Sequence, residues 1–172
     1  TVGVIRNESE LIEEAYKNGH VHFMSMGGGK INSTELVAAM IDQRDNLVDG
    51  LLYAQERIKG SMSILLLTPE GIYASRDRYG RTPITIGCKD GAFCVSFENF
   101  AYLNLGYHHY SELGPGEIAF ITPEGVERKS APRKEMKICS FLWTYYGYPT
   151  ASYEGVNVEQ MRYNCGRLLA RR

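Results

Sequence analysis

Apolar residues follow a helical period in the first third of the chain and a strand period in its middle. Directly after the capping sequence Asn32-Ser-Thr-Glu35, apolar positions recur at the spacing of one helix face. Similar patterns over residues 11–16 and 46–59 predict two further helices, the first of which can begin at Asn7 or Ser9. Apolar runs at residues 2–5 and 21–26 predict strands, and the glycines at 27–29 predict a flexible turn.

From residue 62 onward, pairs of strand-like segments flank short turns. Segments 62–67 and 72–74 flank Thr68-Pro-Glu-Gly71, and segments 84–88 and 92–96 flank Lys89-Asp-Gly91. A third pair, 117–122 and 126–129, flanks the turn at 123–125. Such hairpins form antiparallel sheets, so the helices before and after them predict an α+β fold in layers. The last segment, 158–171, has the apolar spacing of a helix.

Composition places the chain among ordinary globular proteins. Its 172 residues are 44% hydrophobic with a net charge of −1, which suffices for one cored domain and the start of a second. Nothing in this balance indicates a nucleic-acid or membrane partner. With no signal-peptide pattern and no apolar window of about 18 residues, we expect a cytoplasmic protein. Its four cysteines have no Cys-x-x-Cys spacing and are expected to be reduced thiols.

The histidines and the aromatic run near the C-terminus predict little chemistry. His20 and His22 alternate along one predicted strand, and His108 and His109 are expected in a loop. Neither pair has a third ligand at metal spacing, so no metal site is expected in this chain. The aromatic run at residues 143–148 is expected to be a strand that packs at an interface between domains.

Two groups of motifs resemble a known enzyme class. The loop Ser75-Arg-Asp-Arg-Tyr-Gly-Arg-Thr-Pro83, followed by Ser96-x-Glu98, resembles the glutaminase domain of class II glutamine amidotransferases. Farther on, Cys139-Ser-Phe-Leu-Trp-Thr-Tyr-Tyr-Gly-Tyr-Pro149 and residues 161–170 resemble stretches of the amidophosphoribosyltransferases. The chain is therefore similar to that family, with Leu142 where the family has a glutamate.

The resemblance implies a fold and a division into domains. It implies part of a four-layer αββα sandwich of the N-terminal-nucleophile-hydrolase type, with antiparallel sheets. Residues 1–137 would be the C-terminal part of the glutaminase domain, and residues 138–172 the connection toward a phosphoribosyltransferase domain. Because residues 1–5 resemble the internal segment that carries the family's Asn-Gly pair, the nucleophilic cysteine is expected upstream of Thr1.

The resemblance also assigns roles to particular positions. Gly3 matches the glycine of the Asn-Gly pair, but Val2 stands where the oxyanion asparagine belongs, and Ser33 stands where an aspartate holds the glutamine amino group. The loss of an oxyanion donor lowers the rate of such a reaction on the order of a hundredfold. We therefore expect impaired glutaminase activity. No catalytic residue is expected in this chain. Thr1 is kept as an alternative nucleophile that would use its own amine as base.

Arg76, Asp77 and Gly80 have two possible roles in the motif loop. They would form a wall of the glutamine site or a path of communication to the synthase domain, or they would be structural. In the structural interpretation Asp77 accepts main-chain N–H bonds, and Gly80 supplies a positive φ.

Cofactors and partners follow from the resemblance alone. No cofactor is expected in this chain; a full-length relative would use magnesium and could carry a [4Fe–4S] cluster with Cys139 as one ligand. The family uses glutamine and phosphoribosyl pyrophosphate in purine synthesis, and a homo-oligomer is expected. The predicted function is thus a fragment of an amidophosphoribosyltransferase-like amidotransferase, inactive by itself. The alternatives are a non-catalytic scaffold or regulatory module of the same fold, and another class II amidotransferase.

Overall fold

The computed structural model describes residues 1–19, 23–26 and 30–171 of the chain. Of the strand predicted at residues 21–26, the described part contains Ser25–Met26 (β2), which pairs with Lys30–Ile31 (β3). His20, His22 and the glycine turn at 27–29 lie outside the described residues. The other helices and hairpins predicted from the apolar periods are found close to their expected bounds.

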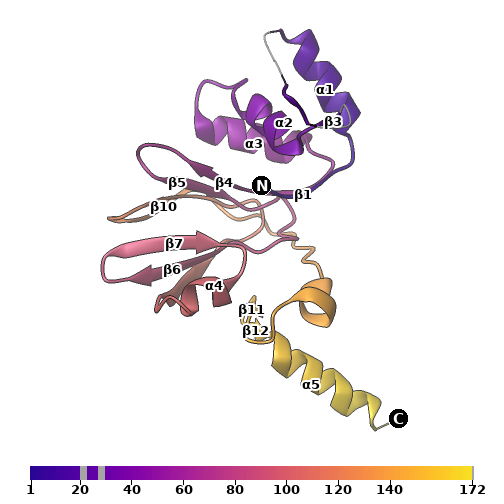
Figure 1. Ribbon diagram of the computed structural model, residues 1–172, viewed down its shortest axis with the longest axis vertical. Helices are drawn as coiled ribbons and strands as arrows, with labels where there is room; N and C mark the ends of the chain where they lie inside the picture. Colours follow the sequence, from indigo (N-terminus) through magenta and orange to yellow (C-terminus); the bar gives the residue numbers. More distant parts are fainter. Residues whose placement is uncertain (20–22, 27–29, 172) are drawn as a thin grey trace.

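A five-stranded antiparallel sheet lies at the centre of the molecule (Figure 1). In spatial order its strands are β1 (Val2–Ile5), β4 (Gly60–Leu67), β5 (Ile72–Ser75), β9 (Ile118–Thr122) and β10 (Gly125–Ser130). The two neighbours of β4 pair with different halves of it, β1 with residues 60–63 and β5 with residues 64–67. β5 therefore does not pair with residues 60–63 of β4. On that side of β4, the loop that follows β5 runs alongside these residues.

Helices α1 (Glu8–Lys17), α2 (Ser33–Ile41) and α3 (Leu47–Arg57) cover one face of this sheet (Figure 1). Asn32 and Asn46 cap α2 and α3, each accepting a main-chain N–H at 2.9 Å with its side-chain oxygen. Asn7 precedes α1 without capping it, because its side-chain oxygen accepts the N–H of Lys59 instead. The core between helices and sheet includes the fully buried Leu36, Leu51, Ala54 and Ile118.

A second antiparallel sheet packs on the other face of the first. It consists of β6 (Thr85–Lys89), β7 (Ala92–Ser96) and β8 (His108–Glu112), in the order β7-β6-β8, and α4 (Asn99–Leu103) packs against it (Figure 1). The core between the sheets is formed by Ala74, Ile84, Ile86, Leu113, Ala119 and Ile121. The predicted α+β class with stacked antiparallel sheets is confirmed.

The prediction of a loop at His108 and His109 was wrong. Both residues begin β8 and pair with Cys88 and Gly87 of β6. β8 is an edge strand whose first three residues are exposed, so it lacks the apolar alternation by which a strand is recognised in a sequence. Pairing with β6, and not local pattern, determines this strand.

The C-terminal segment, residues 138–171, has a small apolar cluster of its own. It contains β11 (Ser152–Tyr153), β12 (Val156–Asn157) and α5 (Val158–Leu169), which extends away from the two sheets (Figure 1). The aromatic run at 143–148 was predicted to be a strand, which was wrong, since residues Leu142–Tyr146 form a π-helical turn. The buried Leu142 side chain and the bond from Trp143 Nε1 to the Val156 oxygen at 2.9 Å hold this turn against the hairpin. None of the described helices is long and apolar enough to cross a membrane.

Replacing Leu51 tests the core between the helices and the first sheet. Leu51 is fully buried, so Leu51→Ala should lower the free energy of unfolding by about 2–5 kcal/mol through lost burial and a cavity. Leu67, 78% exposed at the end of β4, is the matched control, and Leu67→Ala should change stability by less than about 0.5 kcal/mol. Urea unfolding followed by circular dichroism measures both. Equal effects would contradict the assignment of this core.

Candidate functional site

The loop of residues 76–83, which we call the 76–83 loop, joins the two sheets. Asp77, 2% exposed, accepts the N–H of Tyr79 at 3.1 Å and that of Thr82 at 3.2 Å with its two carboxylate oxygens. Its own main-chain oxygen accepts the N–H of Gly80 at 2.8 Å, and Gly80 has a φ of +63°, a conformation that favours glycine. These bonds give the loop a compact turn and occupy both oxygens of the Asp77 carboxylate.

Arg76 is fully buried at the start of this loop. Its Nη2 donates to the main-chain oxygen of Gly80 at 2.7 Å and lies 2.7 Å from Oε1 of Glu154, while its Nη1 donates to the main-chain oxygen of Leu113. A buried charge requires paired and hydrogen-bonded surroundings, and these contacts supply them at Nη1 and Nη2, while the buried Nε has no partner among the described residues. Arg76 thus joins its own loop, the end of β8 and the β11–β12 hairpin.

The main chain of the 76–83 loop also receives the start of the C-terminal segment. The N–H of Lys137 donates to the oxygen of Tyr79 at 2.8 Å, and the N–H of Cys139 donates to the oxygen of Arg81 at 3.2 Å. Residues 137–139 therefore run alongside the loop. Contacts from two separate parts of the chain, 137–139 and Glu154, converge on it.

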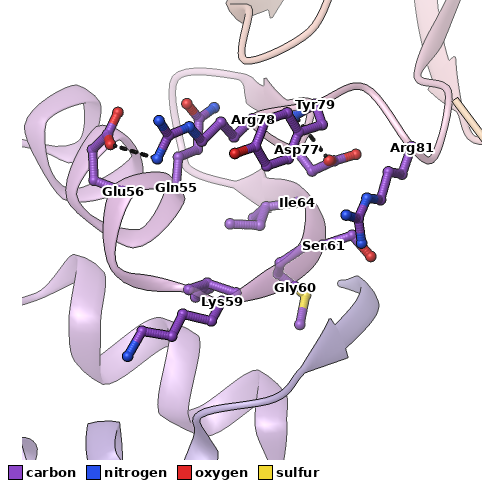
Figure 2. Close-up of a pocket in the computed structure, with 12 residues that line it drawn as sticks. Gln55, Glu56, Lys59, Gly60, Ser61, Ile64, Asp77, Arg78, Tyr79 and Arg81 are labelled. Carbon is purple, nitrogen blue, oxygen red and sulfur yellow. Dashed lines mark hydrogen bonds and ion pairs between the residues drawn. The ribbon is translucent and has the colours of Figure 1, made fainter. Parts of the chain in front are cut away.

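A pocket of about 410 Å³ lies beside the loop, lined by the end of α3, the first half of β4 and residues 77–81 (Figure 2). Gln55, 5% exposed, uses its side-chain NH₂ to bind Ser75 Oγ at 2.8 Å and the Arg76 oxygen at 3.0 Å. Glu56 pairs with Arg78 at 3.2 Å and with Arg133, whose hydrogen bond holds the pKa of the Glu56 carboxyl below its usual value.

Charged side chains from three parts of the chain line this pocket. Of its positive side chains, Lys59 pairs with Glu10 at 2.9 Å and Arg78 pairs with Glu56 at 3.2 Å, and Arg81 lies at the end of the 77–81 lining. Because the Asp77 carboxylate is engaged by main-chain N–H groups, it is not directed into the pocket as a base. Most charged groups of the lining are therefore engaged by partners within the protein.

The positions that the resemblance assigned to the glutamine site lie on the other flank of β4. Gly3 sits in β1 opposite Met62, where an added Cβ would come within 1.9 Å of the Ser61 oxygen. Thr1 Oγ1 lies 2.7 Å from Thr34 Oγ1 at the start of α2, next to Ser33. The structure thus brings Thr1 to the helix end that carries Ser33. The roles of Thr1, Gly3, Ser33, Arg76, Asp77 and Gly80 in catalysis or binding remain predictions.

The residues that dock the C-terminal segment were not predicted from the sequence. Glu112 Oε2 accepts the N–H of Glu154 at 3.0 Å, and Tyr153 donates its hydroxyl to Glu98 Oε2 at 2.5 Å. The one available signal was Gly155 between Tyr153 and Val156, since glycine is favoured in two-residue hairpin turns. Nothing local indicates that this turn meets Arg76.

The cysteines do not form a metal centre within the described residues. Cys88, Cys94, Cys139 and Cys165 are free thiols, and Cys139 is half-buried beside Arg81. Across residues 1–19, 23–26 and 30–171, no group of three or more His, Cys, Asp or Glu side chains is placed to hold a metal ion. An iron–sulfur cluster needs four thiolates, so the described residues do not fit one by themselves.

Relatives with known names match nearly the whole chain, although no family model does. The amidophosphoribosyltransferase of Methanothermobacter thermautotrophicus is 28% identical over 170 residues, covering 98% of this chain and 35% of the relative. That of Bacillus subtilis is 26% identical over 171 residues, with the same two coverages of 98% and 35%. The chain therefore spans about a third of the length of these relatives.

Solved structures match it as well. The B. subtilis glutamine phosphoribosylpyrophosphate amidotransferase, complexed with ADP and GMP, superposes with a TM-score of 0.84 and 26% identity, covering 98% of this chain and 36% of that one. A structure of the allosteric regulatory enzyme of purine biosynthesis superposes with a TM-score of 0.85, 26% identity and the same coverages of 98% and 36%.

The layered sheets and these matches identify the chain as a relative of the glutamine amidotransferases. Within that class it matches the amidophosphoribosyltransferase family over nearly its whole length. The resemblance found in the 76–83 loop and in the C-terminal stretches is thereby confirmed.

The main-chain bonds of Asp77 lead to a stability prediction. Asp77→Ala should lower the free energy of unfolding by about 1–2 kcal/mol, because two part-buried N–H groups lose their acceptor. Asp77→Asn should cost less, since an amide oxygen can still accept one bond. The exposed Asp45 is the control, and Asp45→Ala should change stability by less than about 0.5 kcal/mol. If Asp77→Ala leaves urea unfolding unchanged, the turn does not depend on this carboxylate.

Proposed function

We propose that the chain forms part of an amidophosphoribosyltransferase, which releases ammonia from glutamine and transfers it to phosphoribosyl pyrophosphate in purine synthesis. The observation that carries this proposal is the superposition of 98% of the chain on the B. subtilis glutamine phosphoribosylpyrophosphate amidotransferase, with a TM-score of 0.84. Glutamine and phosphoribosyl pyrophosphate are the partners in this proposal. Nucleic acid and membranes have no part in it.

In this proposal residues 1–137 belong to the glutaminase-type domain, and residues 138–172 lead toward the phosphoribosyltransferase domain. The separate apolar cluster of Leu142, Ala151, Tyr153 and Val158 supports the division. Contacts of the 76–83 loop with both parts support a role for that loop in linking them.

Two substitutions at the glutamine-site positions favour a second candidate, a non-catalytic scaffold or regulatory module of the same fold. Val2 has no side-chain donor for an oxyanion, and the Ser33 hydroxyl donates to Glu8 Oε1 at 3.3 Å. Another class II amidotransferase is the remaining alternative. The match of the C-terminal stretches to amidophosphoribosyltransferases disfavours it.

The location, assembly and cofactors of the complete protein are part of the same proposal. We place it in the cytoplasm as a homo-oligomer. Magnesium would serve the transferase reaction in the complete protein. A [4Fe–4S] cluster there would need three thiolates besides Cys139.

A chimera tests the proposed function against the scaffold. This chain replaces the matching segment of the B. subtilis enzyme, and phosphoribosylamine formation is measured with glutamine and, separately, with ammonia. We expect ammonia-dependent activity to persist and glutamine-dependent activity to be low. Introducing Val2→Asn and Ser33→Asp should raise the glutamine-dependent rate on the order of a hundredfold, because an oxyanion donor and an ammonium partner are restored.

The control for the chimera is Val4→Asn, a matched change at an exposed position of the same strand. It should leave both activities unchanged. Recovery of ammonia-dependent activity without any gain from Val2→Asn and Ser33→Asp would favour the scaffold. If a folded chimera lost both activities, this would contradict the proposal that the chain forms part of an amidophosphoribosyltransferase.

Self-association provides a separate prediction. β1 lies at the edge of the sheet, with Val2 41% and Val4 63% exposed, and such edges invite pairing with another chain. Light scattering after gel filtration should therefore show dimers or larger assemblies, and Val4→Lys should weaken them. Leu105→Lys, at a position 68% exposed and distant from β1 in sequence, should not. A monomer at all concentrations tested would contradict the homo-oligomer.

A further inference from the structure

The β11–β12 hairpin, residues 152–157, is the element through which the C-terminal segment contacts Arg76. Its turn residues Glu154 and Gly155 have φ values of +49° and +74°, the left-handed pair that a two-residue hairpin turn requires. This conformation is unusual for a glutamate and favours glycine or asparagine. Here it directs both the N–H and the carboxylate of Glu154 toward the two-sheet body.

Polar contacts join the hairpin to three parts of that body. Ser152 N donates to Asn99 Oδ1 at 3.1 Å, Tyr153 donates to Glu98 at 2.5 Å, Glu154 N donates to Glu112 at 3.0 Å, and the Glu154 carboxylate pairs with Arg76 at 2.7 Å. The partners thus come from the start of α4, from the end of β8 and from the 76–83 loop. Two of these partners are carboxylates.

Glu112 occupies an unfavourable position for a charge. One of its carboxylate oxygens accepts the Glu154 N–H, while the other, Oε1, is buried and has no hydrogen-bond partner among the described residues. The Glu154 carboxylate lies close to Glu112 and forms an ion pair with the Arg76 guanidinium. If Glu112 also ionised, its negative charge would have few hydrogen-bond donors or positive groups around it.

We propose that the 152–157 hairpin is a latch whose hold on the two-sheet body weakens when Glu112 ionises, because the carboxylates of Glu112 and Glu154 then compete for the single buried guanidinium of Arg76. When Glu112 is protonated, it does not compete for Arg76. The ion pair between Arg76 and Glu154 then keeps the latch closed. The latch sets how firmly residues 138–171 are docked. It does not depend on the reaction of the complete protein.

The direction of the pH effect follows from the two states of Glu112. In the closed latch its pKa is raised from 4.5 to about 7, first by burial and then by the charge of Glu154, while the Glu154 N–H and Arg76 act in the opposite direction. In the open latch Glu112 returns to water, and its pKa falls back toward 4.5. A carboxyl with the higher pKa in the closed state stabilises that state when protonated, so closure weakens as pH rises through about 7.

Other ionisable groups lie around Glu112, among them His109 of the same strand, whose Nδ1 lies 3.4 Å from Thr85 Oγ1. Burial raises the pKa of Tyr102 of α4 from its already high ordinary value, so Tyr102 stays uncharged, and its hydroxyl lies 3.0 Å from His109 Nδ1. Glu117 and Arg128 line a pocket with Glu112 and pair with each other at 2.7 Å. Across β6, the residue opposite Glu112 is Thr85, which does not titrate in this range.

Glu98 requires its own control because it contacts the same hairpin. Burial raises the pKa of Glu98, although the hydrogen bond from Tyr153 opposes the shift. Its titration would therefore act in the same direction as that of Glu112. Glu98→Gln and Glu112→Gln, two changes of equal size, separate the contributions of the two carboxyls.

Hydrogen exchange followed by mass spectrometry on the 172-residue chain tests the latch. Protection of peptides spanning residues 150–158, corrected for the intrinsic exchange rate at each pH, should fall on the order of a hundredfold between about pH 5 and 8. Glu112→Gln should remove most of this pH dependence and keep protection high. Glu154→Gln should lower protection already at the acidic end, because Arg76 loses its charged partner.

The matched control is Glu124→Gln on the exposed β9–β10 turn, which should behave as the unmodified chain does. Constant protection from acidic to neutral pH in the unmodified chain would overturn the proposal. So would a Glu112→Gln chain that keeps the full pH dependence, or a pH dependence that disappears with Glu98→Gln alone.

Discussion

The burial of the Arg76 guanidinium is the constraint on which the connections between the parts of this protein depend. A charge without access to water must be surrounded by acceptors, and Arg76 finds them at Gly80, Leu113 and Glu154. These acceptors belong to its own loop, to the end of β8 and to the C-terminal hairpin. Removing any one of them would leave a buried charge short of a partner. The Arg76 side chain therefore helps to hold these three elements in place relative to one another.

The staggered pairing of β4 makes room for that arrangement. Because β5 pairs with the second half of β4 and β1 with the first half, the chain leaving β5 can pass alongside residues 60–63. The 76–83 loop occupies this space, with Asp77 N donating to Ser63 Oγ at 3.3 Å. On one side the loop borders the pocket of Figure 2, and on the other it receives residues 137–139 and Glu154. A change in the pocket and a change in the C-terminal segment would therefore act on the same short stretch of backbone.

The relation to the amidophosphoribosyltransferases gives this geometry a functional setting. The chain matches about a third of each relative, and its body and C-terminal segment superpose together on the solved B. subtilis enzyme. In the function proposed above, the chain belongs to two domains, and the 76–83 loop contacts the parts assigned to both. Arg76, which one interpretation of the sequence connected with communication between domains, lies at this junction.

Local patterns in the sequence were sufficient for most elements and for part of the site. Asn32 and Asn46 mark helix starts, the Pro-Glu-Gly turns mark hairpins, and Asp77 and Gly80 have the turn geometry that their residue types suggest. In each case the interactions involved span only a few residues. The family resemblance likewise rests on short motifs that can be recognised without a structure.

Which of these elements and side chains contact one another was determined only by the tertiary structure. β8 exists because β6 offers an edge to its polar residues, and the aromatic run forms a π-helical turn because Leu142 is buried beneath the hairpin. Arg76 lies in a loop, where a sequence suggests exposure, yet it is fully buried. Its pairing with Glu154 and the burial of Glu112 join residues far apart in the chain. The energy of a buried charge depends on all its neighbours in space, and a local pattern carries no information about them.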